Sequence, residues 1–154
     1  MKSKKNKLFV KFKVKCFSKD KPYFNVYIFR DQESMYRFFL KENKKYCKDP
    51  ETDFLAICQT YRTYKINPDG SEKMKDCIGN VLFYKDFIGG GVVSHEFVHA
   101  ALHWYGACKA PHKKGWIIIK NMEPDEEDIC HAQSNMVVGF WLKYYELEEE
   151  IKSL

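Results

Sequence analysis

Two histidines, His95 and His99, flank Glu96 in the segment VVSHEFVHAA, residues 92–101. Positions i and i+4 lie on the same face of an α-helix, so both imidazoles can point at one metal ion with Glu96 beside them. Zinc hydrolases use this HExxH pattern to bind the metal and to supply a general base. The residues therefore predict a metal centre with hydrolytic chemistry.

The residues around the pattern bear on whether it is a site or two polar residues on an ordinary helix. In VVSHEFVHAA the motif residues His95, Glu96 and His99 and one serine are the only polar side chains; the other residues are apolar. This composition predicts a buried helix, and burying two histidines and a glutamate without partners would be costly. A bound metal removes that cost, so the flanks favour the metal interpretation.

Two histidines do not complete a zinc site, so we expect a third ligand downstream. His103 continues the same helix but lies too far along its axis to reach the same ion, and His112 has no supporting pattern. The segment MEPDEEDICHAQSNMVVGFW offers Glu127, which stands one turn before His131 and could turn inward, with Glu126 as the second choice. The alternative is that these carboxylates only favour the dipole of a helix's first turn.

The segment GVVSHEFVHAALHW, followed further on by EEDICHAQSNMV, resembles the gluzincin arrangement of an HExxH helix and a Glu-bearing helix. Over residues 78–141 the chain is more closely similar to the small ImmA/IrrE-type and related phage or mobile-element metallopeptidases. The resemblance implies that His95, His99 and Glu127 are ligands of one Zn²⁺ per chain and that Glu96 is the catalytic general base.

The Glu-bearing helix departs from the family pattern. The family has a Glu followed by small residues and then Phe-Ala and Leu-Leu, whereas this chain reads EDICHAQSNMV. This difference leaves the choice between Glu126 and Glu127 open. His131 stands where some gluzincins place a group that supports a zinc-bound histidine, which implies a catalytic role in positioning or in oxyanion stabilisation; a surface histidine is the alternative.

The resemblance implies a zinc-dependent metallopeptidase whose partner is a protein or peptide substrate, such as a repressor-like regulator. One alternative is a non-catalytic, metal-stabilised module that binds nucleic acid or a protein partner through a basic N-terminal sheet. Another is an interaction protein with a decayed site, against which stands the presence of all three motif residues. Glu96→Gln tests the enzyme hypothesis, because it should abolish turnover while leaving the metal bound. Salt-sensitive retention of DNA together with no open metal position would favour the binding module.

Composition sets the remaining limits. A chain of 154 residues with 45% hydrophobic content suits one zincin-like domain, residues 1–154, with one core. The lysines concentrate in residues 2–48, but alternation along a strand explains many of them as a solvent face, so we expect no nucleic-acid partner. Lys11, Lys13 and Lys15 interrupt any signal peptide, and no run is long enough to span a membrane. We therefore expect a cytoplasmic protein; nothing in the sequence indicates its oligomeric state.

Periodicity predicts the elements that must position these residues. The predicted strands are 8–17, 23–30, 54–66 and 77–84, with a hairpin at KDKP and a turn at NPDG; the predicted helices follow Asp31, cover 91–106 and begin near Pro124. Together they predict an α+β fold, a minimal zincin-like domain in which a mostly antiparallel sheet packs against the HExxH helix and the Glu-bearing C-terminal helix. Strand 77–84 is the expected edge for an extended substrate.

Overall fold

The computed structural model describes residues 7–43, 54–61, 64–109 and 122–154. Its strands are β1 (Phe9–Val14), β2 (Tyr23–Phe29), β3 (Ala56–Thr60), β4 (Tyr64–Ile66), β5 (Glu72–Met74) and β6 (Cys77–Tyr84). Its helices are α1 (Gln32–Glu42), α2 (Gly90–Cys108), α3 (Met122–Glu146) and α4 (Glu148–Lys152), with a 3-10 turn at Lys85–Phe87. Within these ranges no helix combines the length and the apolar character needed to cross a membrane.

The main sheet has the strand order β1-β2-β6-β3. β1 and β2 form an antiparallel hairpin and β3 pairs antiparallel with β6, while β2 and β6 run parallel. The predicted α+β fold with a mostly antiparallel sheet is confirmed. The prediction that strand 77–84 forms an edge is wrong, because β6 has a partner on each side; β1 and β3 are the edge strands, and β3 is the one beside β6.

Alternation along β1 follows the predicted pattern. Val10, Phe12 and Val14 are buried in the core beneath the two long helices, whereas Lys11 and Lys13 point to the opposite, exposed side. Successive side chains of a strand face opposite sides of the sheet, so one apolar row suffices to fix which face is buried.

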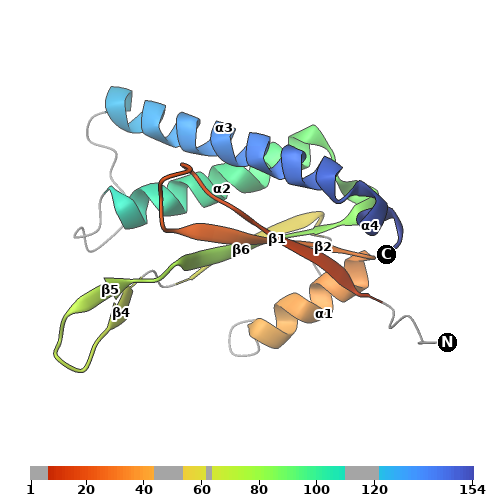
Figure 1. Ribbon diagram of the computed structural model, residues 1–154, viewed down its shortest axis with the longest axis horizontal. Helices are drawn as coiled ribbons and strands as arrows, with labels where there is room; N and C mark the ends of the chain where they lie inside the picture. Colours follow the sequence, from red (N-terminus) through yellow and green to blue (C-terminus); the bar gives the residue numbers. More distant parts are fainter. Residues whose placement is uncertain (1–6, 44–53, 62–63, 110–121) are drawn as a thin grey trace.

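Helices cover both faces of the sheet: α2 and α3 lie on one side and α1 on the other (Figure 1). Phe140 of α3 joins the helices to the sheet in the larger core. The centroid of its ring lies 5.9 Å from that of Phe97 of α2 and 5.2 Å from that of Phe83 of β6. The smaller core lies under α1, where Phe38 packs 5.3 Å from Phe29. The HExxH helix therefore packs against both the sheet and α3.

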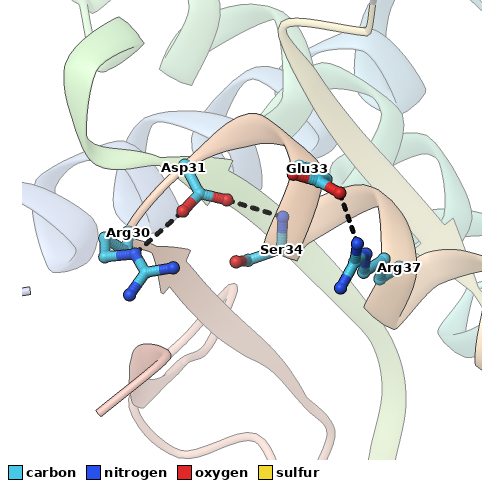
Figure 2. Close-up of polar contacts among 5 residues, drawn as sticks. All are labelled: Arg30, Asp31, Glu33, Ser34 and Arg37. Atoms are coloured by element: carbon cyan, nitrogen blue, oxygen red, sulfur yellow. Dashed lines mark hydrogen bonds and ion pairs between the residues drawn. The ribbon is translucent and has the colours of Figure 1, made fainter. Parts of the chain in front are cut away.

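Asp31 caps α1 as the sequence predicts. Its Oδ1 atom accepts a hydrogen bond from the backbone N–H of Ser34 at 2.7 Å, and Arg30 donates to Oδ2 at 2.8 Å. An ion pair between Glu33 and Arg37 follows along the same helix (Figure 2). The hydrogen bonds from Arg30, the larger contribution, and from Ser34 lower the pKa of Asp31 to about 2.

The segment predicted as one strand, 54–66, is divided between two sheets. Its first part is β3, whereas β4 pairs with β5 in a separate two-stranded hairpin that projects past the start of β6 (Figure 1). The predicted NPDG turn connects them, and Gly70 there has a φ of +81°, which glycine adopts without strain. Tyr64 donates a hydrogen bond of 2.8 Å to the carbonyl of Ala107, which ties the hairpin to the end of α2.

At Gly79 the backbone of β6 lies close to both β3 and the ring of Phe24. A Cβ atom at this position would lie 2.6 Å from the carbonyl oxygen of Gln59 and 2.7 Å from the ring of Phe24. Neighbouring β6 positions carry large side chains, so glycine here is a local requirement of the sheet.

Candidate metal centre

The two histidines of the motif converge. The Nε2 atoms of His95 and His99 lie 3.2 Å apart, and their rings meet edge to face. Two imidazole nitrogens on one tetrahedral Zn²⁺, each about 2.0–2.1 Å from the metal, lie about 3.3 Å from each other. The pair therefore fits a zinc ion; without an ion, the same separation lets one ring donate a hydrogen bond to the other.

Both histidine side chains are exposed, as are Val98 and Leu102 on the same side of α2. The prediction that the whole motif is buried is therefore wrong for the histidines. The sheet and α3 cover only part of the surface of α2. The face that carries the two histidines is exposed to solvent beside β3. The two imidazole rings are therefore accessible from solvent.

Glu96 is the buried member of the motif, with 7% of its surface exposed. Desolvation raises the pKa of Glu96, while His95, His99 and the backbone N–H of Cys58 act in the opposite direction. A carboxylate with a raised pKa is a stronger proton acceptor than an exposed one. The predicted general base is thus held beside the histidine pair and against β3.

Two adjoining hollows, of about 490 and 420 Å³, lie between α2 and β3. They share His95, Glu96, Phe54 and Ala56. The histidines thus form one wall of a groove whose other wall is the edge strand.

The outer edge of β3 is open along this groove. The backbone N–H of Tyr61 bonds inward to the carbonyl of Ile78 on β6. Because the hydrogen-bonding direction alternates along an antiparallel strand, the backbone groups of Ala56, Cys58 and Thr60 point outward. Within the described part of the chain, β3 pairs with β6 alone.

His103 and Cys58 also line the groove, which the sequence pattern predicted for neither of them. Burial lowers the pKa of His103, and its Nε2 atom has no hydrogen-bond partner among the residues described. The i+4 spacing from His99 was a signal for His103. Burial raises the pKa of the Cys58 thiol to about 12, so it stays protonated; no sequence pattern indicated that this residue faces α2.

Glu127 and His131 lie on the outer face of α3. The Nε2 atom of His131 lies 3.4 Å from a carboxylate oxygen of Glu127, and the side chains of Glu127 and His131 are 75% and 69% exposed. Val138 and Leu142 continue this exposed face, while Phe140 points into the core. The expected inward orientation of Glu127 is not observed, because the apolar face of α3 that packs on α2 lies on the opposite side.

The start of α3 lies beside the end of α2, where Lys109 and Asp128 form an ion pair of 3.3 Å. His99 is ten residues before Lys109, which is about 15 Å along a helix. The structure therefore does not bring Glu126 or Glu127 to the histidine pair. Across the ranges described, no three His, Cys, Asp or Glu side chains gather so that they could hold a metal; His112 falls outside those ranges.

Comparisons of the chain with models of protein families, with curated proteins and with solved structures gave no match.

Proposed function

We propose that the protein is a zinc-dependent metallopeptidase in which His95 and His99 bind the metal and Glu96 is the general base. One observation carries the proposal: the two Nε2 atoms converge to 3.2 Å in a groove that also contains the buried carboxylate of Glu96. A chance match to HExxH requires neither the convergence nor the groove. A zincin-like fold is part of the same proposal.

The chemistry divides between the metal and the chain. Bound Zn²⁺ supplies a water of lowered pKa and polarises the scissile carbonyl group. The Glu96 carboxylate accepts the proton of the attacking water and delivers it to the leaving amine. Its burial strengthens this role, because desolvation raises the pKa of the group that must receive the proton.

We propose an extended peptide segment of a protein, such as a repressor-like regulator, as the substrate. The outward backbone groups of Ala56 and Thr60 offer hydrogen bonds to an added strand, which is a common mode of peptide recognition. Phe54 and Leu55, both exposed at the groove, favour apolar substrate side chains. The edge strand and the histidine wall together would place a peptide bond beside Glu96.

The third ligand stays a proposal drawn from the sequence resemblance, with Glu127 first and Glu126 second. In the arrangement described, either carboxylate would need the first turns of α3 to move toward His99. The metal-binding experiment therefore includes both glutamates.

Zinc content of the purified chain by elemental analysis tests the proposal. We expect about one zinc per chain, lost in His99→Ala and retained in Leu102→Ala, a truncation on the same exposed helix face. Loss in Glu126→Ala or Glu127→Ala would identify the third ligand; retention in both would exclude both candidates. Absence of zinc in the unaltered chain after zinc is supplied would refute the metal centre.

A further inference from the structure

A second concave surface lies away from the histidine groove, and we name it the lysine hollow. It has a volume of about 650 Å³ and is lined by Lys13, Lys15, Lys21, Tyr23, Lys73 and Asp76, among others. These residues come from β1 and the segment after it, the start of β2, and the β5 region. The sequence alone gave no indication that Lys73 joins the N-terminal lysines.

The lysine hollow concentrates uncompensated positive charge. Four ammonium groups face a single carboxylate, that of Asp76, at its lining. In the part of the chain that the structure describes, none of these four lysines takes part in an ion pair. Like charges gathered on a concave surface repel one another, and a polyanionic ligand relieves that repulsion.

The walls of the lysine hollow are held in place from several sides. The backbone N–H of Tyr23 bonds to the carbonyl of Asp76 at 2.7 Å, which joins the start of β2 to the segment between β5 and β6. The Lys13 ammonium lies 4.1 Å from the centre of the Tyr23 ring. The bond from Tyr64 to Ala107 anchors the hairpin that carries Lys73. The hollow is thus formed before a ligand arrives, which lowers the entropic cost of binding.

Against the expectation from strand alternation alone, we propose that the lysine hollow binds single-stranded nucleic acid through its phosphate backbone. Lys11, Lys13 and Lys15 stand at alternate positions on the exposed side of the β1 segment, spaced about 6.6 Å apart. Such a row continues the hollow and extends beyond the reach of one phosphate group. A positively charged groove that follows the backbone is typical of proteins that bind single strands without sequence preference.

The lysine hollow offers a phosphate backbone several separate cationic contacts. Its cationic lining consists of lysines, whose ammonium groups act as point charges and bind phosphates from several directions. Among the residues described the lining lacks arginine, so it presents separate point charges and not the forked guanidinium that binds a single carboxylate or phosphate group bidentately. The lysine hollow shares no residue with the metal centre, so the nucleic-acid proposal does not depend on the peptidase function.

Fluorescence anisotropy with a labelled twelve-nucleotide oligothymidylate and the full chain tests the proposal. At about 50 mM salt we expect saturable binding, with a logarithmic salt slope of about −2 to −3 for three or four phosphate contacts. Lys13→Glu/Lys73→Glu should weaken binding at least about tenfold and reduce the slope by about 1.4. Lys41→Glu/Lys85→Glu changes net charge equally outside the hollow and should alter the dissociation constant less than about threefold.

Several outcomes would overturn the proposal: no binding up to about 100 µM protein, equal weakening by both double variants, or tighter binding of a duplex of the same length. Displacement of the oligonucleotide by polyglutamate at matched charge would show that phosphate is not preferred. Lys13→Gln/Lys73→Gln removes the positive charges without introducing repulsion, so it should also weaken binding. Thermal melting of each variant checks that the fold is retained.

Discussion

The backbone N–H of Cys58 on β3 faces the carboxylate of Glu96 on α2. This relationship joins the edge strand of the sheet to the middle of the HExxH motif. It places the proposed base between a histidine pair and a strand edge on which the outward backbone groups of Ala56 and Thr60 have no strand partner among the residues described. The geometry of the groove therefore depends on residues from two elements that are far apart in the sequence.

Glu96→Gln should lower peptidase turnover by about 10²- to 10⁴-fold, the usual contribution of a general base, with zinc content unchanged. The amide oxygen of glutamine still accepts from the Cys58 N–H, so the groove keeps its shape. Turnover of a peptide substrate and elemental analysis of the same preparations check this prediction. Glu33→Gln, on the exposed surface of α1, is the matched control and should retain full turnover; undiminished turnover in Glu96→Gln would exclude the proposed role.

Thr60→Pro tests whether substrate pairs with the outer edge of β3. Proline removes an outward N–H and leaves the inward bonds to β6 in place, and the extended conformation of Gln59 before it is compatible with proline. Loss of one substrate hydrogen bond should raise KM about 3- to 10-fold. Thr60→Ala keeps the N–H and should behave like the unaltered chain. An unchanged KM in a correctly folded Thr60→Pro variant would argue against strand pairing at this position.

Gly79→Ala should lower the free energy of unfolding by about 1–3 kcal/mol, because the new methyl group overlaps the Gln59 carbonyl and the Phe24 ring. The ring can rotate, but the carbonyl belongs to the backbone of the adjacent strand. Urea denaturation measures the change. Gly91→Ala, inside the first turn of α2, is the control, since a Cβ there meets nothing within 4 Å; equal stabilities of the two variants would contradict the account.

Asp31→Ala should lower the free energy of unfolding by about 1 kcal/mol, the usual cost of losing an N-cap. Asp31→Asn retains an oxygen that can accept from Ser34 and should lose less. Thermal melting at neutral pH compares the two variants with the unaltered chain. A smaller loss in the alanine variant than in the asparagine variant would contradict a capping role.

The cap also predicts a pH dependence. The pKa of Asp31 is lowered from 3.8 to about 2 in the folded chain, so its ionised form is favoured by folding. Its contribution to stability is fully present above the unfolded pKa and is lost as the pH falls from about 4 toward 2. The effect is small because Asp31 is well exposed and screened by solvent. The difference in melting temperature between the unaltered chain and Asp31→Asn should shrink over that range.

Local signals explain what the sequence predicted correctly. Alternation gave β1 its buried face, Asp31 lies directly before a helical pattern, and the HExxH residues converge because i and i+4 share a helix face. Each of these features is determined within a few neighbouring residues. The turn at NPDG is of the same kind, since its asparagine, proline and glycine favour the observed conformation.

Features set by distant partners were predicted incorrectly or not at all. β6 lies at the centre of the sheet because β2 pairs with it in parallel, and alternation within β6 cannot reveal that partner. Glu127 faces outward because the apolar residues later in α3 decide which side packs on α2. Lys73 reaches the N-terminal lysines only through the β4–β5 hairpin.

The parallel pairing of β2 with β6 also determines the order in which the chain can assemble during synthesis. The β1–β2 hairpin and α1 are local and can form early, but β3 leaves the ribosome before the strand it must pair with. Until β6 emerges, the inner edge of β2 and both edges of β3 are unprotected against pairing with other chains. The arrival of β6 closes the sheet, and only then does the histidine-bearing helix that follows it have a surface on which to dock.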